Sequence, residues 1–276
     1  MVEGRIAIAL ALAMLPATAP GVAAADRLSV LYRSDAIVTG TGEENRQIGF
    51  RECLGEVLVK VSGDQRILAA PALVPLMQRA GSFVARFSYR DRLEGIPIHD
   101  EQGTHDRPHD LTCFYERSTV DPLLQTLGRK PWLTARPRLV VLLSVRDQER
   151  RFILTSDGAE SPYMAQSLEA ATLPLALAAK LPDSRILLAE RLDTASLTAA
   201  KPARLDALAR LVGGDVALSG TLEWSDAARG WIADWRLLHL GKSYRWLVRG
   251  VSFDEAFRNA VRGAAQILSE NGAPQR

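Results

Sequence analysis

The sequence predicts an α+β protein made of two α/β subdomains, of which the C-terminal one is an antiparallel meander covered by a terminal helix. Three observations predict this fold class. An apolar stripe with helical spacing runs over residues 50–61, a continuous apolar strand runs over 139–143, and a three-strand pattern over 215–251 leads into an amphipathic helix. A meander with one face covered by a helix is a common α+β arrangement.

The domain boundaries follow from the composition along the chain. Residues 1–25 form a predicted signal peptide, and the prolines within 131–137 indicate a stiff connector, because proline fixes the backbone. The remaining segments are an N-terminal α+β subdomain over 26–130, a C-terminal α/β subdomain over 138–270 and a tail over 271–276.

The first segment has the pattern of a bacterial export signal. Arg5 in a short head is followed by the apolar run 6–15 and then by small residues up to Ala25. The run is shorter than the roughly 20 residues that a membrane helix needs, and Pro16 would interrupt it. We therefore expect cleavage after Ala25, a periplasmic or secreted protein, and no transmembrane anchor after cleavage.

In the N-terminal subdomain, short strands and helices are expected to alternate. A strand over 28–32 is followed by a helix that begins at a capping box of Thr41 and Glu44 and ends at Gly63. The other expected elements are a short helix from Pro71, strands over 82–90 and 111–115, and a helix capped by Ser118 and closed by Gly128.

In the C-terminal subdomain, the strand over 139–143 is apolar at every position, which predicts burial on both faces. The last helix is expected to begin at the capping pair of Ser252 and Glu255 and to end near Leu268. The other expected elements are a helix over 164–181, a strand over 186–188, a helix over 203–212 and strands over 215–224, 231–238 and 243–251.

The charge distribution and the missing motifs argue against several classes of protein function. The net charge is +2, from 34 Lys and Arg against 32 Asp and Glu, and the basic residues are interleaved with acids. A nucleic-acid interface needs a concentrated basic stripe, so we expect no nucleic-acid partner. Residues 40–42 lack the lysine of a phosphate-binding loop, and 218–220 lack the first glycine of a nucleophile elbow. We assign no cofactor and no catalytic residue.

The two cysteines admit two interpretations. Cys53 lies on the helical apolar stripe, and Cys113 lies in the strand expected over 111–115. An oxidising compartment permits a disulfide between them, provided that their Cα atoms lie within about 7 Å. Cysteine is also often buried as a free thiol. We favour two buried thiols and keep the Cys53–Cys113 disulfide as the alternative.

Most of the tryptophans lie in the three-strand pattern. They could form an exposed platform for a glycan or a peptide. However, the residues that alternate with them are charged and belong in water, so we predict that the rings face the core. The tryptophans concerned are Trp224, Trp231, Trp235 and Trp246.

The polar stretch over 92–110 contains three of the four histidines. Its least implausible metal ligands are His105, His109 and Asp110, because imidazole and carboxylate groups bind transition metals. Their spacing matches no zinc template. We interpret the stretch as a solvated insertion between two strands and assign no metal site.

Residues 51–63 resemble a block of the domain-of-unknown-function family 2066 (DUF2066), which combines small apolar residues with a valine-leucine-valine-basic-valine-serine-glycine run. Residues 131–132 with 136–137, and the tryptophan-bearing meander with its terminal helix, resemble later landmarks of that family. The resemblance covers essentially the whole chain after Ala25. It implies an exported bacterial protein and supplies no catalytic residues. The C-terminal half also resembles small α/β modules of periplasmic envelope-assembly factors, which bind other proteins.

Together these features favour a non-enzymatic adaptor that binds another envelope protein through an exposed sheet edge or the 92–110 stretch. The alternative is a hydrolase or a metal-dependent enzyme whose site is assembled from distant residues. In that alternative, His105, His109 and Asp110 are the candidate cluster.

Overall fold

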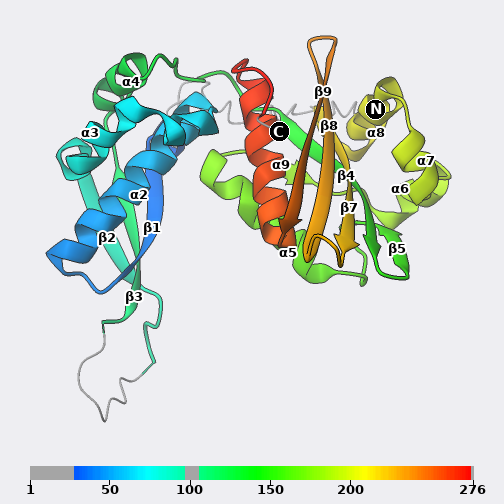
Figure 1. Ribbon diagram of the computed structural model, residues 1–276, viewed down its shortest axis with the longest axis horizontal. Coiled ribbons are helices and arrows are strands. Elements are labelled where there is room, and N and C mark those ends of the chain that lie inside the picture. Colours follow the sequence, from blue (N-terminus) through cyan, green and yellow to red (C-terminus); the bar gives the residue numbers. More distant parts are fainter. Residues whose placement is uncertain (1–27, 97–105, 275–276) are drawn as a thin grey trace, which may run out of the picture.

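The computed structural model describes residues 28–96 and 106–274 and has an α+β fold, which confirms the predicted fold class. The N-terminal half contains a three-stranded sheet, and the C-terminal half contains a six-stranded sheet (Figure 1). In these two described ranges, no helix is both long enough and apolar enough to cross a membrane.

The N-terminal sheet is antiparallel, with strand order β1-β3-β2, and one helix packs across it. Helix α2 buries the predicted apolar stripe against β1 and β3, and Gly63 ends it with a left-handed φ of 76°. The α-helices and strands of this half are β1 (Arg33–Thr39), α2 (Glu43–Ser62), α3 (Val74–Gln78), β2 (Arg86–Asp91), β3 (Pro108–Phe114) and α4 (Arg117–Thr126). Short 3-10 helices are η1 (Gln65–Ala69), η2 (Pro71–Leu73) and η3 (Ala80–Phe83).

The C-terminal sheet is mixed. Strand β4 pairs in parallel with β6 and β7 and antiparallel with β5, and β7, β8 and β9 form the predicted antiparallel meander. The strands are β4 (Arg138–Asp147), β5 (Arg150–Ile153), β6 (Ala178–Lys180), β7 (Val216–Ser225), β8 (Gly230–His239) and β9 (Lys242–Val251). The helices are α5 (Pro162–Thr172), η4 (Leu173–Leu175), α6 (Ser184–Ala189), α7 (Thr194–Ala199), α8 (Pro202–Val212) and α9 (Phe253–Leu268).

Helices cover both faces of this sheet. Helices α5 and α9 pack on one face, and α7 and α8 pack on the other, so that β4 is buried on both sides as its sequence predicts (Figure 1). The core on the α9 face is continuous with the core under α2 in the N-terminal half, whereas the α8 face has a smaller core of its own.

The tryptophans of the meander face the core, as predicted. Trp231, Trp235 and Trp246 are buried, and Trp224 is half-buried with its ring centroid 5.7 Å from that of Trp231. Helix α9 approaches them closely through Gly263, where a Cβ atom would lie 2.7 Å from the Trp246 ring. The Ser252 hydroxyl accepts a hydrogen bond from the Glu255 N–H and caps this helix, as its sequence indicates.

Two strand predictions are wrong. Residues 28–31 are helical, and the first strand begins only at Arg33. The run 186–188 lies in helix α6, because the Asp183 carboxylate accepts a hydrogen bond from the Arg185 N–H and caps a helix there. Apolar runs this short do not distinguish a helix from a strand by periodicity.

Some predicted boundaries also differ from the structure. The helix expected over 164–181 ends at Thr172, because Pro174 supplies no N–H and Ala176 has a left-handed φ of 49°. The chain then forms β6 beside β4. The remaining differences are the N-cap residues of α2 and α4, which are Gly42 and Glu116 instead of Thr41 and Ser118, and the start of the strand expected at 82, which is Arg86.

Candidate functional site

The two candidate metal ligands that the structure describes, His109 and Asp110, do not form a metal site. His105 lies outside the described residues. His109 and Asp110 are consecutive in β3 and therefore face opposite sides of the sheet. The Asp110 carboxylate accepts a hydrogen bond from Arg90 at 2.6 Å. Over 28–96 and 106–274, no group of three or more His, Cys, Asp or Glu residues is arranged to hold a metal ion.

The cysteines form a disulfide, so the favoured interpretation of two free thiols is corrected. Cys53 of α2 and Cys113 of β3 are bridged, with their Cα atoms 6.3 Å apart. Both residues are fully buried. The bridge joins the helix to the central strand of its sheet.

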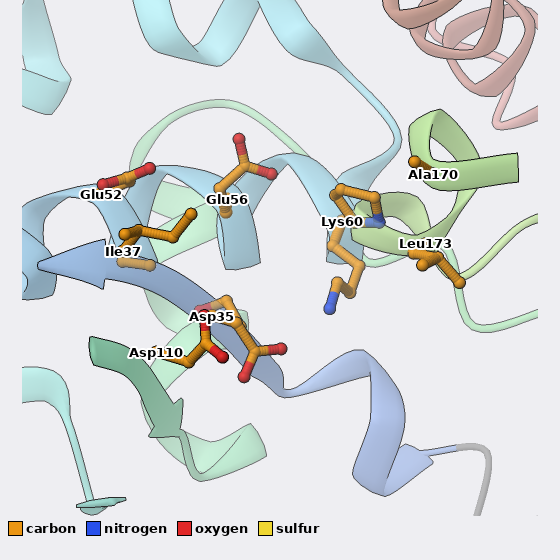
Figure 2. Close-up of a pocket in the computed structure, with 11 residues that line it drawn as sticks. Asp35, Ile37, Glu52, Glu56, Lys60, Asp110, Ala170 and Leu173 are labelled. Carbon is orange, nitrogen blue, oxygen red and sulfur yellow. The ribbon is translucent and has the colours of Figure 1, made fainter. Parts of the chain in front are cut away.

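A cleft of about 410 Å³ lies between the N-terminal sheet and the α5–η4 segment of the C-terminal half. Figure 2 shows side chains from both halves around it. Strand β1 and helix α2 form one side, and Ala170, Leu173 and Pro174 form the other. Ile37 and Leu173 are apolar but 57% and 68% exposed, so each half presents an apolar side chain at the cleft.

The backbone of β1 lines this cleft with its unpaired edge. In the β1–β3 ladder, the Gly40 N–H donates to the Arg107 carbonyl at 2.7 Å, and the Tyr115 N–H donates to the Tyr32 carbonyl at 2.8 Å. Because hydrogen-bonded pairs alternate along antiparallel strands, the even-numbered residues of β1 bond to β3. The odd-numbered residues direct their N–H and C=O groups to the open edge.

Two side chains of α2 cover the ends of this edge. Lys60 Nζ donates to the Arg33 carbonyl at 2.5 Å, and the Asn45 side-chain amide donates to the Thr39 carbonyl. Between these contacts, the outward backbone groups of residues 35–37 form no hydrogen bond with any part of the described chain. Both backbone groups of a residue are therefore open only at Asp35 and Ile37, in the middle of the edge, where it borders the cleft, whereas the carbonyls of Arg33 and Thr39 are already occupied.

Most of the charged side chains that line the cleft are carboxylates. Asp35, Glu52, Glu56 and Asp110 line it, and Lys60 is the single basic residue among its lining residues. In Figure 2, the two aspartates lie on one side of β1, and the two glutamates of α2 lie on the other. Burial, together with the negative charge of Glu56, raises the pKa of Glu52.

Lys60 is almost completely buried, with 6% of its surface exposed. Burial lowers its pKa to about 8, although Asp35 and Glu56 act in the opposite direction. Lys60 is not among the described residues that pair with a carboxylate within 4.0 Å. Its ammonium group has three N–H donors, and the Arg33 carbonyl accepts one of them.

The two halves are held together at the C-terminal end of α2, at residues 60–64, which we call the junction. The last carbonyls of a helix lack partners within the helix. Donors from the connector and the C-terminal tail supply these partners: Trp132 N–H to the Val61 carbonyl (2.7 Å), the Asn271 amide to the Ser62 carbonyl (2.9 Å) and the Arg136 guanidinium to the Lys60 carbonyl (2.5 Å). The junction thus fixes α2, and with it one wall of the cleft, against the C-terminal half.

Asp64 is the most deeply buried charge of the junction. Its side chain is fully buried and accepts hydrogen bonds from Arg66 at 2.8 and 2.9 Å and from Arg129 at 2.6 Å. Arg66 also donates to the Asn271 carbonyl at 2.5 Å. Burial opposes ionisation of Asp64, but the hydrogen bonds and charges of the two arginines outweigh it and hold the pKa of Asp64 below its ordinary value.

Gly63 allows the close approach of the two halves. Substitution Gly63→Ala is expected to lower the free energy of unfolding by about 3 kcal/mol, from a left-handed φ of 76° and from steric overlap. The new Cβ would lie 2.6 Å from the Ser269 Cβ and 3.1 Å from the Trp132 ring. Gly241→Ala is the matched control, because Gly241 has a φ of 75° and a Cβ there would meet no atom within 4 Å.

Urea denaturation of the two variants separates strain from overlap. Gly241→Ala is expected to lose only about 1 kcal/mol, the cost of the backbone conformation. Equal losses in the two variants would contradict the close packing at the junction.

The cleft could not be found from the sequence, because its lining comes from four separate segments. One signal was present. In residues 33–39, the small or apolar Ser34, Ala36 and Val38 alternate with residues that are mostly polar, and the structure shows that these three are the buried positions of a strand with one covered face.

Residues 25–133 match a family described as a domain of unknown function, DUF8605. This match covers β1, α2 and the rest of the N-terminal half through Leu133. No curated protein and no solved structure matches the chain. The N-terminal part therefore contains a domain of unknown function.

Proposed function

We propose that this protein is an exported, non-enzymatic adaptor that binds another envelope protein in the cleft between its two halves. The open edge of β1 carries this proposal. A strand edge that lines a cleft offers backbone donors and acceptors to an extended segment of another chain, which is a recurring mode of peptide recognition. Native proteins usually cover or block such edges.

Three features support export. Residues 1–25 have the pattern of a signal peptide, and residues 51–63 resemble the exported DUF2066 family. The Cys53–Cys113 disulfide is typical of an oxidising compartment such as the periplasm. Mass spectrometry of the N-terminal peptide tests this step: a mature chain that begins at Asp26 is expected, and retention of Met1 would contradict it.

Binding in the cleft can be tested by site-specific photocrosslinking in the cells that produce the protein. A photoreactive phenylalanine analogue replaces Ile37 or Leu173, which lie at the cleft on opposite halves. We expect both positions to yield a covalent adduct with the same partner protein, identified by mass spectrometry.

The control places the same analogue at Leu240, which is 78% exposed in the turn between β8 and β9. Leu240 should give no such adduct. An identical adduct from Leu240, or different adducts from Ile37 and Leu173, would contradict binding in the cleft, as would the absence of any adduct from both cleft positions.

A further inference from the structure

We propose that the occupant of the cleft is an extended segment of the partner protein that pairs with the open edge of β1 and carries basic side chains toward its carboxylates. This inference rests on the proposed function and names the chemistry of the segment. Three interactions support it: backbone hydrogen bonds between the segment and β1, attraction between basic side chains of the segment and the carboxylates of the cleft, and an apolar contact with Ile37 and Leu173.

Only a short stretch of β1 is available for backbone hydrogen bonds with an added strand. Asp35 and Ile37 direct both their N–H and C=O groups outward, whereas the outward carbonyls on either side, those of Arg33 and Thr39, already accept hydrogen bonds from the Lys60 and Asn45 side chains. An added strand can therefore pair through both backbone groups with two residues of β1. At about 3.3 Å per residue, the paired part of the segment is about three residues long.

The charge attraction follows from where the side chains of an added strand would point. A residue opposite Asp35 lies on the exposed face of the sheet, beside the Asp35 carboxylate, which is 51% exposed. A residue opposite Ala36 points to the other face, where Glu52 and Glu56 of α2 line the cleft. Lysine or arginine at both positions is attracted, whereas acidic residues are repelled.

Asp110 already pairs with Arg90 at 2.6 Å and Arg92 at 3.5 Å, but the existing partners of the other three carboxylates leave room for a ligand cation. Glu52 is in none of the ion pairs of the described residues. Glu56 contacts Arg262 of α9 at 3.4 Å, and the two side chains remain 26% and 30% exposed. Asp35 pairs with Arg33 at 3.4 Å, and its carboxylate also accepts a hydrogen bond from Thr112 at 2.5 Å.

The third position of the segment, opposite Ile37, is expected to carry an apolar side chain. A residue opposite Ile37 lies on the exposed face next to that side chain, and Leu173 faces the cleft from the C-terminal half. An aliphatic residue there would cover apolar surface that is now in water. In a segment that runs antiparallel to β1, the preferred order from its N-terminus is therefore an aliphatic residue followed by two basic residues.

Synthetic peptides test this inference with the purified full chain. The probe is an acetylated, amidated hexapeptide of sequence TVKKVT, and the matched control is TVEEVT. We expect the lysine peptide to bind at least about tenfold more tightly in low salt. In NMR titrations, the amide resonances of residues 35 and 37 should move most.

Two further measurements separate strand pairing from simple charge attraction. N-methylation of the central backbone amides removes donors, and it should weaken binding of the lysine peptide about tenfold. In the protein, Glu52→Gln with Glu56→Gln should weaken it by a similar factor, whereas Glu149→Gln with Glu160→Gln, outside the cleft, should not.

Each outcome decides the inference. Equal affinity of the lysine and glutamate peptides, no effect of N-methylation, or no binding of either peptide would overturn it. If photocrosslinking at Ile37 and Leu173 nevertheless captures one partner, the adaptor function stands and only the chemistry of the segment is wrong. If crosslinking also fails, the proposed function fails with it.

Discussion

Reduction of the Cys53–Cys113 disulfide is expected to lower the free energy of unfolding by about 4 kcal/mol. The bridge closes a loop with a sequence separation of 60, and a cross-link stabilises a protein mainly by restricting the unfolded chain. It also joins α2 to β3, the middle strand of its sheet. Since α2 supplies the glutamates and Lys60 of the cleft, reduction should loosen that wall as well.

The measurement is urea denaturation with and without dithiothreitol. The transition of the oxidised protein should lie at clearly higher urea than that of the reduced protein. The control is the Cys53→Ala/Cys113→Ala variant, whose transition should not respond to dithiothreitol. A wild-type transition that is equally insensitive, with free thiols detected by alkylation, would show that the folded protein holds no bridge.

Long patterned elements were predictable from the sequence because many residues contribute to one signal. Helix α2, strand β4, the β7–β9 meander and helix α9 all have their predicted character. The failures are short runs such as 28–32 and 186–188. In the second case, the Asp183 carboxylate accepts a hydrogen bond from the Arg185 N–H and caps a helix, and hydrophobic periodicity does not contain that information.

The candidate site was less accessible to sequence reasoning. The cleft depends on tertiary contacts between segments far apart in the chain, and the openness of the β1 edge depends on which strand lies beside it. Residues 61–63 and Trp132 lie in segments whose resemblance to the DUF2066 family implied no role for them, and the family that matches residues 25–133 is instead the domain of unknown function DUF8605. The structure shows that they are the places where the connector and the C-terminal tail bond to the end of α2.

The second large effect on stability is expected from substitution of Asp64, the buried carboxylate at the junction that pairs with two arginines. Asp64→Ala is expected to lower the free energy of unfolding by about 3 kcal/mol, because it leaves Arg66 and Arg129 without their shared carboxylate. The estimate is at the low end for buried pairs, since both arginines retain some access to water, 34% and 27%. Asp183→Ala is the matched control: Asp183 also caps a helix and binds the arginine two residues later, but on the surface. Its loss should be much smaller.

The stabilisation that Asp64 provides is expected to depend on pH. The folded-state pKa of Asp64 is lower than its ordinary value, so its ionised form stabilises the fold above the unfolded-state pKa of about 4. That stability is lost as the pH falls through the folded-state pKa. The difference in unfolding free energy between the wild type and Asp64→Asn should therefore be constant from about pH 5 to 8 and should shrink below about pH 4. A difference that stays constant down to about pH 2 would mean that the charge of the Asp64 carboxylate does not stabilise the fold, and that the substitution acts through packing at the junction.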